Sequence, residues 1–468
     1  MLRPRTGAIL RLRLVNSALR RCYPIQSIRH FQVVNGETGD THGPTALGTL
    51  PSYTESRAFW QRTIAAMTTA QADACDPKGP LHGVRVLALE QAVAGPLCTR
   101  HLADLGADVI KIERPGGGDF ARRYDTAVKG LSSYFVWLNR GKRSLTLDMK
   151  RPEARDVLER LIASSDVLVQ NLGPGAIDRL GFAPARLRRD YPALVITSIS
   201  GYGSGGPYET RKAFDLLLQG ETGVIATTGS GDQLAKLGIS VGDIGAGVYG
   251  AMGTLAALYE RRATGQGRLV ETSLFDALAE WMGYPAYFTL YGGEPPARAG
   301  VRHATVVPYG SYTCADGAVL FAVQTETQWA AFCDTVCGHP EWETDVRFNT
   351  SAQRRINRDV LEAMIEEAFS ALTRAEVERR LEIADIPFGA VNEVAEFVAH
   401  PQLAARDRWR EVGSPAGPLR AIVPPIDLEG MPPRMDAIPD VGDHTAEVLG
   451  ELGYNAREMG RLREHGVV

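Results

Sequence analysis

The residues Leu237-Gly-Ile-Ser-Val-Gly-Asp243-Ile-Gly-Ala-Gly-Val-Tyr-Gly250 hold a single carboxylate in a run of small and apolar residues. Aspartate is a poor helix former, and it is costly to bury unpaired. Its place between Gly242 and Gly245 therefore predicts an exposed elbow that a ligand approaches closely. The next residues, to Arg262, form an apolar helix pattern. We expect Asp243 at or just before the start of this helix, where the helix dipole stabilises negative charge.

Two other interpretations of this stretch do not involve a reactive aspartate. A lone Asp before a helix is most simply an N-cap without chemistry, and the stretch alone favours that reading. The segment Gly245-Ala-Gly247-Val-Tyr-Gly250 also matches the dinucleotide fingerprint G-x-G-x-x-G. Only a weak strand pattern precedes it, and no convincing ribose-binding acid follows about 20 residues on. We therefore discount dinucleotide binding.

Composition narrows the class of protein. The chain has 468 residues, of which 44% are hydrophobic and 23% charged, so it is large enough for two or more cores. Its net charge of -4 provides no basic field to recruit nucleic acid or a membrane. No apolar run reaches the length of a transmembrane helix. The six cysteines form no disulfide framework, and Cys333, Cys337 and His339 lack a second ligand pair, so we expect no metal site.

The N-terminus differs from the rest of the chain. Basic residues interleaved with apolar ones precede the first acidic residue, Glu37; they are Arg3, Arg5, Arg11, Arg13, Arg20, Arg21 and Arg29. This composition is typical of a mitochondrial transit peptide, so we expect residues 1–32 to direct the protein to the mitochondrial matrix. A basic disordered tail is the alternative. Residues 33–80 are polar and punctuated by prolines, and we interpret them as a linker.

The central part of the chain alternates strand and helix patterns. Residues 83–90 and 107–113 read as buried strands around a helix, which is a βαβ unit of a parallel sheet. The pattern recurs through residues 151–198 and predicts a Rossmann-like α/β fold. A composition shift suggests a small α+β domain. The expected domains are a large one from residues 81–249 and 326–468 and a small one from residues 250–325.

Basic and amide side chains gather near the predicted strand ends, where ligands of such sheets bind. The group is Arg114, Arg140, Lys142, Arg143, Lys150, Asn171, Arg179 and Lys212. Such groups suit a pyrophosphate or a 3′-phosphate. Any one of them alone reads as a solvated surface charge. Serine hydrolase chemistry is poorly supported, because the chain has no G-x-S-x-G elbow.

Several motifs together closely resemble one enzyme family, the class III CoA-transferases. They include Ala94-Gly-Pro96, the segment from Leu102 to Pro115, Gly118-Asp119, Asn139-Arg-Gly-Lys-Arg-Ser144 and Asn171-Leu-Gly-Pro-Gly175. The resemblance extends from about Leu81 to the end of the chain. It implies a large domain built from both chain ends, a small domain, and a ring-shaped protomer interlocked with a second one as a homodimer. No permanently bound cofactor is implied, because the coenzyme A thioester is a substrate.

The resemblance also assigns residues. It makes Asp243 the nucleophile, which reverses the preference for a bare N-cap, and it gives Asp215 a supporting role. Coenzyme A is expected against Ala92, Arg114, Leu147, Lys150, Asn171, Arg179 and Lys212. The implied mechanism is covalent: Asp243 passes through a mixed anhydride and an aspartyl-CoA thioester.

Within the family, the chain looks most like the mitochondrial succinate–hydroxymethylglutarate CoA-transferases. This implies succinyl-CoA as donor and hydroxymethylglutarate, glutarate or itaconate as acceptor, with Arg298, Arg302 and His303 available to bind a second carboxylate. One alternative is a 2-methylacyl-CoA racemase of the same fold, but Phe214 occupies the position of the racemase histidine and cannot shuttle a proton. The other alternative is a catalytically inactive CoA-binding protein.

Overall fold

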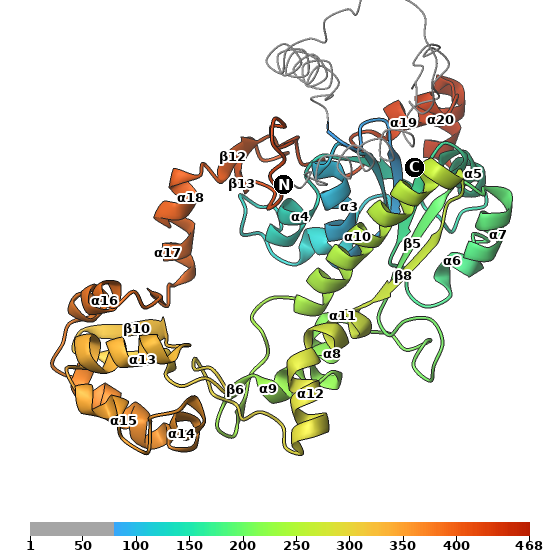
Figure 1. The fold of residues 1–468 in the computed structure, drawn as a ribbon. Helices are drawn as coiled ribbons and strands as arrows, with labels where there is room; N and C mark the ends of the chain where they lie inside the picture. The colour runs from blue at the N-terminus through green and yellow to red at the C-terminus, as the bar shows by residue number, and fades with distance from the viewer. Residues whose placement is uncertain (1–78) are drawn as a thin grey trace, which may run out of the picture. The chain divides into compact units, whose positions relative to one another are not determined.

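The computed structural model describes residues 79–468, so the predicted transit peptide and most of the predicted linker lie outside the described residues. A six-stranded parallel sheet forms the main layer, in the order β3-β2-β1-β4-β5-β8 (Figure 1). Its strands are β1 Arg85–Leu89, β2 Asp108–Glu113, β3 Lys142–Thr146, β4 Val167–Gln170, β5 Val195–Ser200 and β8 Leu269–Ser273. Counting β8 as the sixth strand, this is the Rossmann order, so the predicted α/β class is confirmed.

Helices cover both faces of the sheet. Alternate residues of β1 point to opposite sides: Val86 and Ala88 join one apolar cluster, and Leu87 and Leu89 join another. One face is packed by α3 Ala94–Asp104, α8 Asp215–Glu221, α10 Val241–Thr264 and α11 Leu274–Trp281. The other is packed by α5 Ala154–Ala163, α6 Ala176–Arg179, α7 Pro184–Asp190, α19 Thr445–Glu451 and α20 Ala456–Glu464.

A separate apolar cluster lies in residues 307–386. It is built on an antiparallel sheet of β9 Tyr309–Cys314, β10 Gly317–Ala322 and β11 Phe388–Gly389. Its helices are α13 Glu326–Ala331, the π-helix η2 Phe332–Cys337, the 3₁₀ helix η3 Pro340–Glu343, α14 Ser351–Ile356, α15 Arg358–Phe369 and α16 Arg374–Ile383. Because β11 and these helices follow residue 325 and complete this unit, the predicted boundary between residues 325 and 326 is wrong.

The predicted boundary at residue 250 is wrong as well. It falls inside α10, and β8, which follows it, is an edge strand of the large sheet. The remaining elements are short: the 3₁₀ helix η1 Phe120–Arg123, α4 Ser133–Leu138, α9 Val224–Thr227, β6 Gly229–Ser230, β7 Gln233–Leu234, α12 Gly283–Gly292, α17 Val394–Val398, α18 Pro401–Ala405, β12 Trp409–Val412 and β13 Leu419–Ile422.

The helix α10 is central to the packing. Among the described residues it is the one helix long and apolar enough to cross a membrane, but 56% of its most apolar window is buried inside the protein. It packs against α3, α11, β5 and β8. This burial is typical of a core helix.

Candidate active site

Asp243 lies in the first turn of α10. The helix begins at Val241 and its N-cap is Ser240. Asp243 is therefore not the cap, and it does not lie in the exposed elbow that the sequence had suggested. The side chain is partly buried. Within the described residues, its carboxylate has no hydrogen-bond or ion-pair partner. A carboxylate left unpaired at a helix start is available to react with a ligand.

The glycines after Asp243 serve helix packing. A Cβ added at Gly247 would lie 2.7 Å from the carbonyl oxygen of Ala94 in α3, and one added at Gly253 would lie 2.5 Å from the Val270 side chain in β8. These positions admit only glycine without a shift of their neighbours. The G-x-G-x-x-G match therefore lies inside a helix rather than in a strand-to-helix turn, which agrees with the decision to discount dinucleotide binding.

Asp215 caps α10 from another helix. It is the first residue of α8, and its Oδ1 accepts hydrogen bonds from the backbone N–H groups of Gly242 at 2.7 Å and Asp243 at 3.4 Å. Its Oδ2 accepts from Gln219, whose own side-chain oxygen accepts from the backbone of Leu237. The carboxylate thus satisfies N–H groups that a helix start leaves unpaired. It also holds the segment that leads into α10.

The same arrangement raises the pKa of Asp243. Burial disfavours the charged carboxylate, and the negative charge of Asp215 adds to the effect, so the pKa rises from 3.8 to about 7. A carboxylate with a pKa near neutrality is a stronger nucleophile than an ordinary aspartate and is still largely ionised above pH 7. Perturbation of this size from burial and a charged neighbour is typical of functional sites.

The carboxyl ends of β1 and β4 meet at the point where the strand order reverses, which is where such sheets bind ligands. Asn171 follows β4 and pairs with both backbone groups of Gln91, which follows β1. Its Oδ1 accepts from the Gln91 N–H and its Nδ2 donates to the Gln91 carbonyl, both at 2.8 Å. Ala92 comes next, in a left-handed conformation with φ of 61°. Two residues of the predicted coenzyme A site, Ala92 and Asn171, are thereby brought together.

The other predicted coenzyme A residues follow the strands β2 to β5 of the same sheet. Arg114 follows β2 and is exposed, and Leu147 follows β3 but is buried in the core, so only its backbone is available to a ligand. Lys150, Arg179 and Lys212 are exposed in the connections that follow β3, β4 and β5. Arg179 donates to the carbonyl of Pro174 at 3.2 Å. The strand ends therefore present cations to solvent on neighbouring connections.

Three basic residues grouped with these by sequence are committed to internal ion pairs. Arg140 pairs with Asp104, Lys142 with Glu90, and Arg143 with Asp108 and Glu451, with N···O distances of 2.6 to 2.8 Å. Arg140 and Lys142 are also buried. The prediction that these three side chains bind a ligand is therefore wrong.

Aromatic residues that sequence reasoning missed lie beside Asp243. Tyr124 packs edge-on against Tyr134, which in turn packs against Trp137. Tyr134 and Trp137 share an apolar cluster with Ile244, the residue after Asp243. The pKa of the Tyr124 hydroxyl is raised to about 12 by burial and then by the charges of Asp119 and Asp243. The run of aromatics after Gly118-Asp119 was the signal available in the sequence.

The cations suggested for a second carboxylate are engaged elsewhere. Arg298 donates to the backbone carbonyls of Gly231 and Ala226. Arg302 pairs with Glu362 and Glu366. The His303 ring accepts hydrogen bonds from the backbone N–H groups of Thr305 and Val306. Arg302 therefore holds the small sheet to α15 rather than facing a ligand.

Sequence comparison identifies the family. The sequence model of CoA-transferase family III matches residues 81–445, which is most of the chain. The chain belongs to this family. It is consequently an enzyme that transfers coenzyme A.

Individual relatives support this family assignment. The formyl-CoA:oxalate CoA-transferase of Rhodopseudomonas palustris is 33% identical over 414 residues, covering 83% of this chain and 97% of the relative. The acetyl-CoA:oxalate CoA-transferase of Acetobacter aceti is 35% identical over 349 residues, covering 74% and 90%. A CaiB/BaiF family protein from Brucella suis has a crystal structure that superposes with a TM-score of 0.71 at 33% identity, covering 80% of this chain and 99% of that one.

Proposed function

We propose that this CoA-transferase moves coenzyme A from an acyl-CoA to a small dicarboxylic acid through a thioester on Asp243. The observation that carries the proposal is the unpaired carboxylate of Asp243 in the first turn of α10, with its pKa raised to about 7. Asp215 supports this group by capping the helix.

In the proposed mechanism, Asp243 is the only residue that forms a covalent bond to a substrate. Its carboxylate attacks the donor thioester carbonyl and expels the CoA thiolate, which leaves a mixed anhydride. The thiolate then attacks the aspartyl carbonyl, forms the aspartyl-CoA thioester and releases the donor acid. The acceptor carboxylate attacks this thioester and expels the thiolate, which finally attacks the acceptor acyl carbonyl and frees Asp243. Water must be excluded, because anhydrides hydrolyse.

The exposed cations at the strand ends suit the charged half of coenzyme A. We assign its phosphates to Arg114, Lys150, Arg179 and Lys212, all exposed on the connections that follow β2 to β5. Arginine and lysine bind phosphate oxygens well. We assign a backbone contact to Leu147. The Ala92 turn, which Asn171 holds through Gln91, packs on the same apolar cluster as Ile244, the residue after Asp243.

We assign the acceptor by its chemical class, a small dicarboxylic acid. Relatives named for oxalate act on the shortest dicarboxylic acid, and the sequence resemblance to succinate–hydroxymethylglutarate CoA-transferases points to longer ones. We propose succinyl-CoA as donor and hydroxymethylglutarate, glutarate or itaconate as acceptor. The test is a panel of these acids with oxalate, succinate and acetate, each incubated with succinyl-CoA or formyl-CoA, with new thioesters read by mass. Turnover only with oxalate would overturn the longer acceptors.

The nucleophile has its own test. Incubation with acyl-CoA followed by hydroxylamine should convert Asp243 to a hydroxamate that peptide mass spectrometry locates, and Asp243→Asn should abolish both the adduct and transfer. An unmodified Asp243 in active enzyme would refute the role. Solvent deuterium entering the acyl α-carbon without an acceptor acid would instead favour the racemase.

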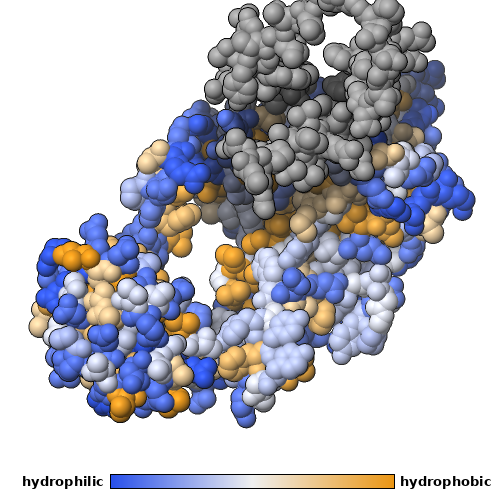
Figure 2. All heavy atoms as spheres, viewed as in Figure 1, coloured by the Kyte–Doolittle hydropathy of each residue, from blue (hydrophilic) through white to orange (hydrophobic). Residues whose placement is uncertain are grey.

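We also propose a homodimer. Hydrophobic residues reach the surface on the face shown in Figure 2. On α12 no residue is buried, and Tyr287, Leu290 and Tyr291 are 66–79% exposed. Apolar area of this kind is usually covered by a partner. Leu290→Glu should shift the protein toward monomer in analytical ultracentrifugation, whereas a monomeric parent protein would refute the proposal.

The mitochondrial address remains a proposal based on the arginine-rich residues 1–32. A fluorescent fusion of the full chain should co-localise with a matrix marker, and removal of residues 1–32 should return it to the cytosol. Unchanged localisation of the shortened fusion would contradict the proposal.

A further inference from the structure

The turn between β1 and α3 contains a strained residue. Ala92 has a φ of 61°, a left-handed conformation that residues other than glycine adopt at a cost. Such a conformation persists only where surrounding contacts enforce it. The contacts that enforce this one are therefore a guide to what the turn does.

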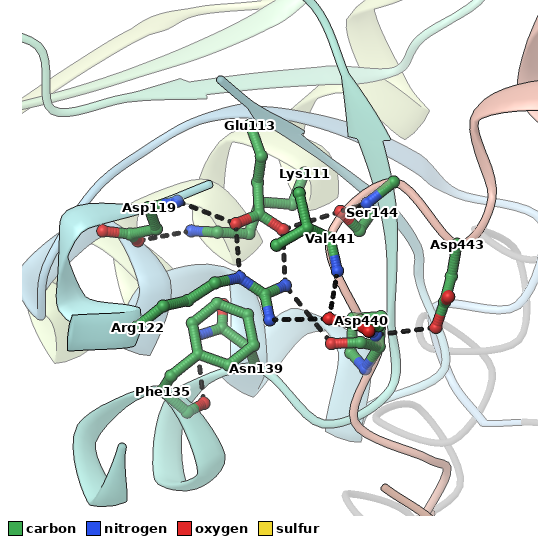
Figure 3. Close-up of polar contacts among 12 residues, drawn as sticks. Lys111, Glu113, Asp119, Arg122, Phe135, Asn139, Ser144, Asp440, Val441 and Asp443 are labelled. Atoms are coloured by element: carbon green, nitrogen blue, oxygen red, sulfur yellow. Dashed lines mark hydrogen bonds and ion pairs between the residues drawn. The ribbon is translucent and has the colours of Figure 1, made fainter. Parts of the chain in front are cut away.

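Asp119 supplies the contact to Ala92 itself. Its Oδ1 accepts hydrogen bonds from the backbone N–H groups of Ala92 at 3.2 Å and Ala121 at 3.0 Å. Its Oδ2 accepts from the Lys111 ammonium at 2.9 Å (Figure 3). Lys111 is fully buried and Asp119 is 4% exposed. The carboxylate is therefore fixed on one side by an ammonium and on the other by the strained turn.

The same buried network fixes both ends of the turn. Glu90, immediately before it, accepts hydrogen bonds from Lys142 at 2.7 Å, Lys111 at 3.3 Å and the hydroxyl of Thr99 at 2.6 Å. Lys142 also donates to the carbonyl of Pro96 in the first turn of α3 at 2.9 Å. Two carboxylates and two ammonium groups thus balance inside the protein. Buried networks of this kind contribute little net stability, so stability alone does not explain why these four side chains surround the turn.

The turn lies against the start of α10. Ala92 and Ile244 pack on the same apolar cluster, and Ile244 follows Asp243 directly. The carbonyl of Ala94 approaches α10 so closely that Gly247 has no room for a Cβ. A displacement of the turn would therefore change the space beside Asp243.

We propose that Asp119 is a positioning residue for CoA transfer: through the Ala92 N–H it holds the turn between β1 and α3 in its strained form, and so sets the wall against which the thioester meets Asp243. The inference rests on the proposed role of Asp243, and it assigns no chemistry to Asp119 itself. A wall displaced by about 1 Å can cost about 100-fold in rate.

The test is a double-mutant cycle of Asp119→Ala and Ala92→Gly, with kcat, KM, CoA affinity and Tm measured for each protein. Asp119→Ala should lower kcat about 10- to 100-fold. CoA affinity should change less than about threefold, because the phosphate-binding cations are untouched. Glycine adopts the left-handed conformation without strain, so adding Ala92→Gly should restore kcat of Asp119→Ala by at least about fivefold. If Asp119→Ala does not fold because the buried Lys111 ammonium is left unpaired, Asp119→Ala combined with Lys111→Met takes its place and is compared with Lys111→Met alone.

Asp104→Asn is the matched control. Asp104 is another buried carboxylate with an arginine partner, Arg140 at 2.8 Å, but it lies at the opposite end of α3. This variant should have a lower Tm than the parent protein and an unchanged kcat. The proposal is overturned if the double variant is no faster than Asp119→Ala, or if Asp119→Ala and Asp104→Asn lose kcat alike. The hydroxylamine test of Asp243 is independent, so a failed rescue counts against Asp119 alone.

Discussion

Replacing Asp243, the proposed nucleophile, by Asn should stabilise the protein at neutral pH. In Asp243→Asn, the folded chain no longer has to hold an ionised carboxylate in a place where burial and Asp215 disfavour it. The folded-state pKa of Asp243, about 7, lies above the ordinary 3.8. The folded state therefore binds the proton more tightly than the unfolded state. Its contribution to stability is fully present below pH 3.8 and is lost as the pH rises through 7.

The size of the effect follows from the pKa shift. A shift of about 3 units at about 1.4 kcal/mol per unit corresponds to about 4 kcal/mol over the whole range. Solvent reaches part of the Asp243 side chain, so we expect about half of this, about 2 kcal/mol. Most of the loss falls between pH 5 and pH 8, and Asn, which does not titrate, escapes it.

Urea unfolding of both proteins at pH 5, 6, 7 and 8 measures the difference. The free energy of unfolding of Asp243→Asn should gain about 1 kcal/mol on the parent protein between pH 5 and pH 8, because about 60% of the expected change falls within this range, and the m values should be equal. Two stability curves that stay parallel over this range would refute the assigned electrostatics. If the free energy of unfolding of Asp243→Asn instead falls relative to that of the parent protein as the pH rises, the ionised carboxylate is stabilised in the folded protein.

Further variants test the surrounding contacts. Asp215→Asn keeps an oxygen that can cap α10 but removes the negative charge, so the acid limb of the pH–kcat profile, set by Asp243, should move to lower pH; an unmoved limb would show that burial alone sets that pKa. Gly247→Ala should destabilise the protein by about 1–3 kcal/mol, because its Cβ meets a backbone carbonyl of α3; a Tm equal to that of the parent protein would disprove the close contact. Arg302→Gln leaves the buried Glu362 with a weaker partner and should lower Tm without changing the ratio of kcat/KM for dicarboxylic over monocarboxylic acids, whereas a changed ratio would place Arg302 in the acceptor pocket.

Local patterns in the sequence predicted the sheet well. The βαβ units are read from short runs of apolar residues, and their strand ends follow directly, so Arg114 and Asn171 were placed at the correct edge. The domain boundaries were not readable in this way. The aromatic stretch after Trp281 marks exposed helices such as α12, which a change in composition does not distinguish from a new domain.

Contacts between distant residues escaped the sequence analysis. Asp215 caps a helix that begins 26 residues later, and no local signal marks that pairing. Arg143 and Arg179 look alike in sequence, but the first is paired with Asp108 and Glu451, and the second is exposed. Whether a cation is free to bind phosphate depends on partners that only the folded chain brings together.

The glycine contacts of α10 with α3 and β8 have a consequence for catalysis. A helix packed this closely on two sides cannot slide or rotate without clashing with a backbone carbonyl or a β-branched side chain. The part of the backbone that carries the proposed nucleophile, Asp243, is therefore held in place. Under the proposed mechanism, donor and acceptor acids take turns at this one point, so we expect that enlarging the space for the acid, rather than altering the helix, redirects the enzyme toward other acids.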